Sequence, residues 1–183
     1  MTRIIAGRLG GRRLRVPGEG TRPTSDRVRE SVFNMLAART DLDGLWVLDL
    51  YAGSGALGLE AISRGAAGAT FVDSGRRAAA TIAANVRSCG VASVATVHTR
   101  AVSAYLAGTP DRRFGLVFSD PPYDLGADRV AADLALLPAH LDDDALIVVE
   151  RSTRSVGEIW SPGYEVLVDK SYGDTRVEIA RPV

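Results

Sequence analysis

The stretch V-L-D-L-Y-A-G-S-G-A-L-G-L-E-A, residues 47–61, decides the fold of this chain. Its first residues complete a short apolar run, Trp46–Leu50, which predicts a buried parallel strand. Gly53, Gly55 and Gly58 follow in G-x-G-x-x-G spacing, and the chain then turns helical. Glycine permits a tight turn and a close approach of a ligand to the backbone, and the next helix offers N–H groups. The stretch therefore predicts a nucleotide-type site, although ordinary strand-to-helix turns use the same spacing.

Strand and helix patterns alternate along the chain from this stretch onward. The first five strand candidates are residues 46–50, 69–72, 94–98, 116–118 and 145–149, and the helix candidates are residues 56–64, 76–87, 101–106 and 127–136. This order predicts an α/β, Rossmann-like doubly wound sheet with right-handed crossovers. Residues 164–169 and 176–180 are also strand-like, with no helix between them. We therefore expect a seven-stranded sheet that ends in an antiparallel C-terminal hairpin.

Length and composition fit one domain with a small appendage. The chain has 183 residues, of which 46% are apolar, enough for a sizeable core. Glycines at positions 7, 10 and 11 separate two short alternating runs, residues 3–6 and 12–16, which predict a β-hairpin. We expect a basic N-terminal hairpin arm over residues 1–20 and a single α/β domain over residues 21–183.

The numbers and positions of cysteine and histidine residues bear on the cellular compartment and on metal binding. Cys89 is the only cysteine, so no intrachain disulfide can form, which fits the cytoplasm, where we expect the protein. His98 and His140 lie far apart and make no zinc pattern with one cysteine, so we expect no metal. No apolar run approaches a membrane span. No feature demands a dimer, and we expect a monomer.

The net charge is zero but unevenly distributed. Residues 1–30 carry eight arginines and three acidic residues, a charge of +5, so residues 31–183 carry −5. Alternation in the second run places Arg13 and Arg15 on one face, with Leu14 and Val16 on the other. A basic arm favours a polyanionic partner, whereas the alternative is a solvated surface. The candidate RNA-binding residues are Arg3, Arg8, Arg12, Arg13, Arg15 and Arg22.

A helix is expected to begin near Ser25-Asp26, capped by Thr24 or Ser25. Its apolar stripe predicts that it covers the sheet. The stripe consists of Val28, Val32, Met35 and Leu36. A covering helix does not explain Arg27, Arg29 and Asn34 on the other faces, and a solvated surface is the alternative for them.

Two acidic residues end neighbouring strand candidates. Asp49 comes just before the glycine loop, and it can either cap the loop's N–H groups or receive a ligand ammonium. Asp73 follows the glycines by about 20 residues, the position from which a carboxylate accepts hydrogen bonds from ribose hydroxyls. It can also cap the helix that begins after Ser74. Position and sequence favour ribose binding for Asp73.

A third motif, Asp120-Pro121-Pro122-Tyr123, ends the strand candidate at residues 116–118. Two prolines extend the backbone and remove two N–H donors, which leaves acceptors, the Asp120 carboxylate and the Pro121 carbonyl. The Tyr123 ring lies beside them. This set suits a planar group with an exocyclic NH2, whose N–H groups are accepted while the ring stacks on the base. A dehydrogenase would share the glycine loop and Asp73 but has no need of this turn.

Together these motifs resemble Rossmann-like methyltransferases that use S-adenosylmethionine and methylate an exocyclic amine. Three further segments extend the similarity to nearly the whole chain: R-I-I-A-G-R-L-G-G-R-R-L at residues 3–14, R-P-T-S-D-R-V-R-E-S-V-F-N-M-L at 22–36 and Y-G-D-T at 172–175. The chain as a whole resembles the RsmD family of ribosomal RNA guanine-N2 methyltransferases.

The resemblance implies a substrate and a set of site residues. The substrate would be one guanine N2 in small-subunit (16S) ribosomal RNA, within a partly assembled subunit. The implied cofactor-binding residues are Asp49, Tyr51, Gly53, Gly55, Asp73, Arg100, Ala101 and Thr24, and the implied catalytic residues are Asp120, Pro121 and Tyr123. Two departures stand out: Asp73 replaces an expected longer Glu, and the Arg100 side chain cannot accept a bond from the adenine amine.

Other functions remain open from the residues themselves. The acceptor turn does not distinguish guanine from adenine, cytosine or a protein glutamine. A non-catalytic RNA-binding protein on the same fold is the alternative from another class, and the intact Gly53, Gly55, Asp73 and Asp120 argue against it.

Overall fold

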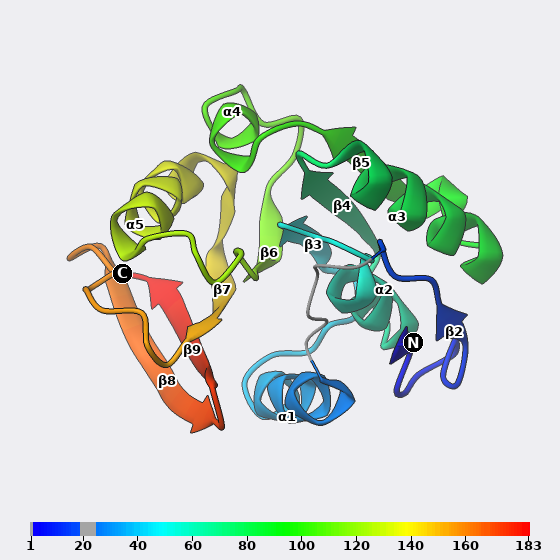
Figure 1. Ribbon diagram of the computed structural model, residues 1–183, viewed down its shortest axis with the longest axis horizontal. Helices are drawn as coiled ribbons and strands as arrows, with labels where there is room; N and C mark the ends of the chain where they lie inside the picture. The colour runs from blue at the N-terminus through cyan, green and yellow to red at the C-terminus, as the bar shows by residue number, and fades with distance from the viewer. Residues whose placement is uncertain (1, 19–24) are drawn as a thin grey trace.

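The computed structural model describes residues 2–18 and 25–183, and its main feature is a seven-stranded sheet (Figure 1). The helices are α1 Asp26–Ala37, α2 Ala56–Ser63, α3 Arg76–Cys89, α4 Val102–Leu106 and α5 Ala127–Leu136, with short 3-10 helices at Ala92–Val94 and Leu137–His140. The strands are β1 Thr2–Arg3, β2 Arg13–Leu14, β3 Trp46–Leu50, β4 Gly68–Asp73, β5 Ala95–Thr99, β6 Phe114–Ser119, β7 Leu141–Ser152, β8 Tyr164–Tyr172 and β9 Thr175–Pro182.

The sheet has the strand order β5-β4-β3-β6-β7-β9-β8. Its first five strands pair in parallel, and β9 and β8 pair antiparallel at the end. Gly173 and Asp174 form the two-residue turn of this last hairpin, since Tyr172 pairs with Thr175. The doubly wound fold with an antiparallel C-terminal hairpin is therefore confirmed.

Apolar residues alternate along the parallel strands and fill two layers of core. In β3, Val47 belongs to the layer under α1, α2 and α3, whereas Leu48 belongs to the layer under α4 and α5. Figure 1 shows α1 and α2 on one face of the sheet and α4 and α5 on the other. Both faces of the parallel strands are thus covered, which explains their near-continuous apolar sequences.

The strand β7 begins four residues earlier than the sequence indicates. Its partner register with β6 shifts between Phe114 and Leu116, and the aspartates Asp142–Asp144 lie exposed at this irregularity. Charged residues predict a loop, but a bulge lets a strand carry them into solvent. None of the helices within residues 2–18 and 25–183 is long and apolar enough to cross a membrane.

The N-terminal hairpin is shorter than predicted and packs firmly against the body. Its ladder contains only two residue pairs, Thr2 with Leu14 and Arg3 with Arg13. Its apolar side chains are buried in the same core layer as α1 and α2, and these are Ile4, Leu9 and Leu14. Gly7 has a φ of +80°, and a Cβ there would lie 2.0 Å from the Ser63 carbonyl oxygen. The hairpin is therefore an integral part of the core layer.

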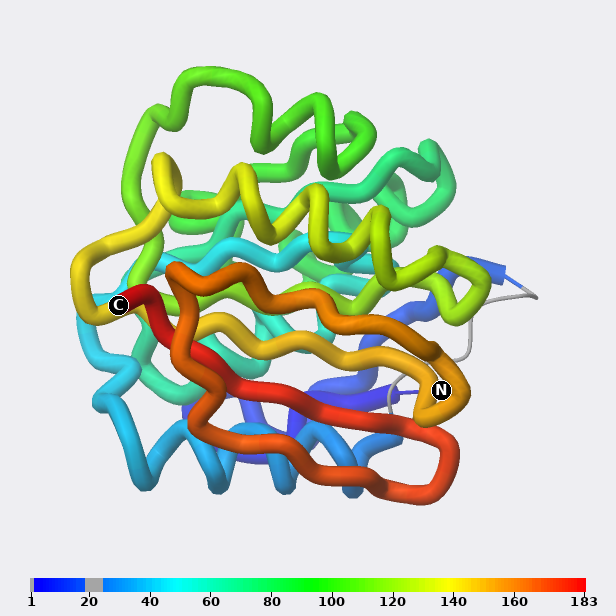
Figure 2. Tube along the Cα trace, turned by 90° about the vertical axis from the view of Figure 1, so that its left-hand side faces the viewer, coloured from blue at the N-terminus to red at the C-terminus, as the bar shows by residue number. Residues whose placement is uncertain are grey.

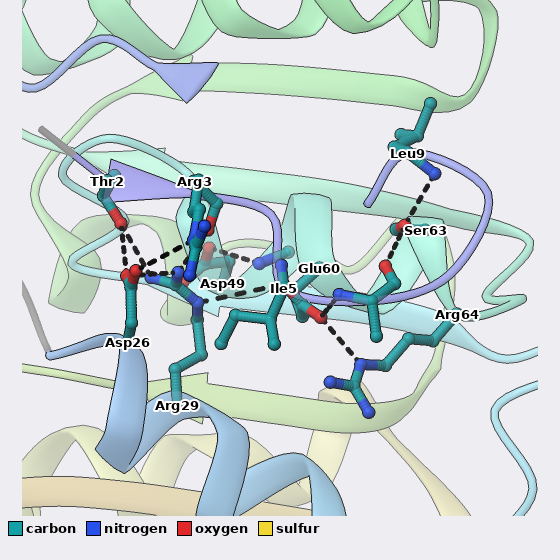
Figure 3. A network of polar contacts seen from close by, with 12 residues as sticks. Thr2, Arg3, Ile5, Leu9, Asp26, Arg29, Asp49, Glu60, Ser63 and Arg64 are labelled. Carbon is teal, nitrogen blue, oxygen red and sulfur yellow. Dashed lines mark hydrogen bonds and ion pairs between the residues drawn. The ribbon is translucent and has the colours of Figure 1, made fainter. Parts of the chain in front are cut away.

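Two buried charges hold this hairpin to α1 and α2 (Figure 3). Glu60 of α2 accepts hydrogen bonds from the backbone N–H groups of Ile5 at 2.7 Å and Ala6 at 3.0 Å. Arg29 of α1, only 1% exposed, donates to the Thr2 hydroxyl at 3.0 Å and to the Arg3 carbonyl. Its Nε lies 3.8 Å from Glu60 Oε2.

The alternative of a solvated surface is therefore wrong for Arg29. A guanidinium carries five donors, and three of those in Arg29 face the hairpin backbone, Thr2 and the carboxylate of Asp26, 2.9 Å away. Ser25, one of the two predicted caps, accepts the Val28 N–H at 3.2 Å and begins α1. The other, Thr24, lies outside the described residues.

We predict that Glu60→Ala lowers the free energy of unfolding by about 3–5 kcal/mol, because it leaves two backbone N–H groups and the Arg64 Nε–H without their acceptor and removes the carboxylate paired with the buried Arg29. Chemical denaturation measures the loss. Glu30→Ala, on the exposed side of α1, is the matched control and should stay within about 0.5 kcal/mol of the unaltered protein. Equal stability of both variants would contradict the role given to Glu60.

Candidate active site

A cleft of about 980 Å³ opens at the carboxyl ends of β3, β4 and β6. Its walls are residues 16–18, 51–54, 56–57, 73–75, 77–78 and 120–125, and Arg29 and Asp49 also line it. Ligands bind in doubly wound sheets at this edge. The volume is at the upper end of the range for small-molecule sites, which leaves room for a cofactor and a second group.

The glycine loop is shaped by three residues with positive φ. Tyr51, Gly53 and Gly55 have φ values of +56°, +58° and +78°. A positive φ in a residue with a bulky side chain is strained, and such strain concentrates at functional sites. Gly58 has a different task, because a Cβ there would lie 2.4 Å from the Phe71 ring. Gly58 therefore allows α2 to pack directly on β4.

Asp49 lies at the floor of the cleft and is almost completely buried. Its carboxylate accepts the Gly58 N–H at 2.9 Å, so the capping role considered for it is present. Burial raises the pKa of Asp49 well above its ordinary value, and the charges of Asp120 and Asp73 add to the shift, against the lowering effect of the Gly58 bond. A cationic ligand in the cleft would oppose this shift.

Asp73 holds two turns of the cleft wall. One carboxylate oxygen accepts the Gly53 N–H at 2.9 Å, and the other accepts the Gly75 N–H at 2.8 Å ahead of α3. Each carboxylate oxygen can accept more than one bond, so ribose hydroxyls can still be accommodated. Asp73 thus holds the turn ahead of α3 and also has a position suited to binding a ribose.

The Asp120-Pro121-Pro122-Tyr123 turn lies directly beside the glycine loop. The register of β3 and β6 pairs Leu50 with Ser119, so Tyr51 and Asp120 follow at neighbouring strand ends. The Pro122 carbonyl accepts the Leu125 N–H at 2.9 Å and closes the turn. Tyr123 is 40% exposed, and its hydroxyl is 2.8 Å from Thr175 Oγ1 of β9. The ring is thus held in place with part of its surface open to the cleft.

Tyr51 lines the cleft as well, with its hydroxyl turned toward α5. The hydroxyl donates to the buried carboxylate of Asp133. Burial and this bond raise the pKa of Tyr51, so the phenol stays protonated. Tyr51 can therefore contribute its backbone and ring to a ligand, while its hydroxyl stabilises the fold.

Several predicted site residues lie elsewhere or outside the described chain. Arg100 and Ala101 are not among the residues that line the cleft. The Arg100 N–H donates to the Asp73 carbonyl at 3.0 Å, and the Ala101 carbonyl accepts the Tyr105 N–H at 3.0 Å. Arg22 and Thr24 lie outside the described residues. Gly55 shapes the turn, and it is Gly53 that lines the cleft.

The arginines of the hairpin are exposed, namely Arg3, Arg8, Arg12, Arg13 and Arg15. Arg13 and Arg15 point outward and Leu14 inward, as the alternation predicts. Val16 was expected to lie on the apolar face with Leu14, but it is 37% exposed and lines the cleft. The hairpin therefore continues directly into the cleft wall.

Asn85, which joins this hairpin to the glycine loop, was not predicted from the sequence. It is buried in α3, and its side chain pairs with both the N–H and the carbonyl of Arg15, each at 2.9 Å. The same amide donates to the Ser54 carbonyl at 2.9 Å. An asparagine between Ile82 and Val86 on the apolar face of a helix is the signal that could have revealed it.

The geometry of this site can be compared with that of known proteins. A family model described as conserved hypothetical protein 95 matches residues 2–181. "Ribosomal RNA small subunit methyltransferase D" of Escherichia coli K12 is 43% identical over 151 residues, which cover 81% of this chain and 73% of that protein. This chain belongs to the RsmD family of methyltransferases. The Bacillus subtilis protein YlbH is 38% identical, with 97% of each chain covered.

Solved structures agree with this assignment. The Escherichia coli protein yhhF, 36% identical, superimposes with a TM-score of 0.84 over 99% of this chain and 97% of its own. Magnesium protoporphyrin IX methyltransferase from Synechocystis, solved with bound S-adenosylmethionine, has a TM-score of 0.68 over 86% of this chain and 79% of its own. At 14% identity this second likeness shows a shared fold alone.

We predict that Asp49→Asn gains stability relative to the unaltered protein as pH rises. The folded pKa of Asp49 is raised, so folding favours its protonated form, and the stability from this group is lost as pH rises through the folded pKa. The amide keeps an acceptor for Gly58 without an ionised state. Denaturation between pH 5 and 9 measures the difference, with exposed Asp43→Asn as control. If stability depended on pH in the same way in Asp49→Asn and in the unaltered protein, the raised pKa of Asp49 would be refuted.

Proposed function

We propose that this protein transfers the methyl group of S-adenosylmethionine to the exocyclic N2 amine of one guanine in small-subunit ribosomal RNA, within an assembling subunit. The observation that carries the proposal is the position of the Asp120 turn beside the glycine loop, imposed by the pairing of Leu50 with Ser119. The names of the relatives support a ribosomal RNA substrate. Guanine N2 is our inference from the RsmD resemblance.

The residues of the cleft fit S-adenosylmethionine. The Asp73 carboxylate, which accepts the N–H groups of Gly53 and Gly75, faces the cleft where a ribose would lie. The buried Asp49 would attract the positive charge of the methionine ammonium or the sulfonium, since its ionised form has no cation bonded to it among its described partners. The glycine loop lets the ligand approach the backbone closely. When bound, S-adenosylmethionine supplies an electrophilic methyl group.

The Asp120 turn would hold the target amine. The Asp120 carboxylate and the Pro121 carbonyl accept its two N–H groups, while the Tyr123 ring stacks on the base. Guanine N2 is a weak nucleophile, because its lone pair is delocalised into the ring. The two acceptors favour a more pyramidal nitrogen and stabilise the positive charge that develops there. Held this way, the amine would displace the sulfur of the donor from the methyl group and would then release a proton to solvent.

Positioning supplies the main rate enhancement in this scheme, because two reactants held in line avoid most of the entropic cost of a bimolecular step. Neighbouring strand ends provide that alignment. The direct test is mass mapping of 16S ribosomal RNA from cells with and without the gene. One N2-methylguanine should disappear in the mutant, and an unchanged modification pattern would reject the proposal.

We predict that Asp120→Asn lowers kcat by about 100-fold or more, because an amide places a donor where the amine needs an acceptor. Affinity for S-adenosylmethionine should change less than about twofold, since the contacts proposed for the cofactor lie on other strand ends. Single-turnover methylation and calorimetry measure the two quantities. Asp128→Asn, exposed on α5, is the control. Lost cofactor affinity with normal turnover would reverse the assignment.

For the hairpin, we predict that Arg13→Ala combined with Arg15→Ala weakens RNA binding and flattens its dependence on salt. Removal of one arginine from a phosphate reduces the salt slope by roughly 1. The Arg15 backbone still pairs with Asn85, so cofactor affinity should stay constant. Deleting the hairpin is a poorer test, because it would uncover core residues. Arg39→Ala with Arg181→Ala, at exposed sites on other elements, is the control; equal salt slopes in both pairs would remove the hairpin from the RNA site.

A further inference from the structure

We propose that the segment Thr153–Gly157, here called the β7 loop, is a second RNA-contact surface on the rim of the cleft. In this proposal Val156 packs against a base or sugar next to the target nucleotide, and Arg154 contacts the adjoining phosphate. The inference rests on the proposed function only in taking RNA as the substrate, and it does not depend on which base is methylated.

The β7 loop begins at the same edge of the sheet as the Asp120 turn. Strands β6 and β7 are parallel neighbours, with Ser119 paired to Val149, so both end toward the cleft. Figure 2 shows the segments after β6 and β7 gathered at one side of the molecule, the side on which β2 also ends. A strand of RNA that delivers a base to Tyr123 would therefore pass close to this loop.

A chain of contacts links the loop to Tyr123. The Thr153 N–H donates to the Asp174 carbonyl at 2.9 Å, in the turn that precedes Thr175. Thr175 pairs with Ser152 across the sheet, and its hydroxyl lies 2.8 Å from the Tyr123 hydroxyl. Thr175, at the start of β9, thus links the first residue of the β7 loop to Tyr123, whose ring we propose stacks on the base.

Val156 has an exposure that a folded protein alone does not require. It is 89% exposed, compared with 42% for Val166 on the edge strand β8. A single exposed valine is ordinary, but this one lies in the loop that follows β7, two residues from Arg154, whose side chain is 86% exposed. The Arg154 Nη2 atom lies 3.9 Å from Asp174 Oδ1. Such an exposed ion pair contributes little, so a phosphate can replace the carboxylate.

Buried side chains brace the loop. The Arg151 guanidinium donates to the Gly157 carbonyl at 3.0 Å and to the Glu178 carboxylate at 2.8 Å. Within the loop, the Ser155 N–H donates to the Ser152 carbonyl at 3.0 Å. Gly157 has a φ of +112°, and a Cβ there would lie 3.0 Å from the Ala127 Cβ. The structure therefore presents Val156 outward on a fixed support, which lowers the entropic cost of a contact.

Charge favours RNA as the partner. The β7 loop has one charged residue, the exposed Arg154, whereas Arg151 before the loop is buried against Glu178. The hairpin that carries the exposed arginines lies on the opposite side of β3 and β6 from β7 and β9 (Figure 1). One apolar side chain for a base and one arginine for a phosphate are the two contacts that single-stranded nucleic acid offers.

The first test compares Val156→Ala with Val166→Ala, the same change at an exposed site on β8. The substrate is small ribosomal subunits from a strain that lacks the gene. With this substrate Val156→Ala should lower kcat/KM about tenfold, and Val166→Ala should not. Cofactor affinity and Tm should match those of the unaltered protein in both variants. Equal activity of the two variants would overturn the proposal. A loss of Tm or cofactor affinity in Val156→Ala would also overturn it, since the residue would then be structural.

The second test identifies what the loop touches. A photoreactive benzoylphenylalanine at position 156 should crosslink to 16S ribosomal RNA within a few nucleotides of the modified base. A crosslink only to ribosomal protein, or none to RNA, would overturn the proposal. The outcome is separable from that of the proposed function: methylation of adenine would reject guanine N2 and leave the loop's role intact, whereas normal guanine methylation without the crosslink would reject the loop alone.

Discussion

The backbone of α2 packs so closely on β4 at Gly58 that a Cβ would lie 2.4 Å from the Phe71 ring. This approach brings the Gly58 N–H to the Asp49 carboxylate, 2.9 Å away at the end of β3. It also sets the angle at which the glycine loop leaves the sheet. Farther along the same helix, Glu60 and Ser63 hold the backbone of the N-terminal hairpin. Any side chain at position 58 would therefore displace the cleft floor and the hairpin together.

The hairpin and the cleft are one mechanical unit for a related reason. Asn85 holds Arg15 on one side and Ser54 on the other, and it is buried, so no water competes for its bonds. The chain then runs from Arg15 into residues 16–18, which line the cleft. An RNA phosphate bound at the Arg13 and Arg15 side chains would therefore meet a surface whose backbone is fixed relative to the glycine loop. RNA contact and methyl transfer need not be joined by a flexible linker.

The sequence predicted the sheet because its parallel strands are buried on both faces and read as continuous apolar runs. It also predicted the acceptor turn and the glycine loop, whose spacing is local. It failed where a polar residue is buried by partners distant in sequence and where a strand is irregular. Arg29 reads as a solvated helix residue until Glu60 and the hairpin backbone are brought to it. Asp142–Asp144 read as a loop, because a bulge that carries them into solvent leaves no local signal. The cofactor contact of Arg100 stays a prediction: its N–H donates to the Asp73 carbonyl, and the residue does not line the cleft.

The charge within the cleft affects how strongly the methyl donor and its product would bind. Asp49, Asp73 and Asp120 all line it, and the repulsion of the last two contributes to the raised pKa of Asp49. A cationic methyl donor would relieve this repulsion, whereas its product carries a neutral sulfur and would relieve less. Asp49, the carboxylate proposed to attract the donor, would thus bind the product more weakly. In the proposed mechanism the Asp120 carboxylate has a further task, which is to stabilise the positive charge that develops on the methylated nitrogen.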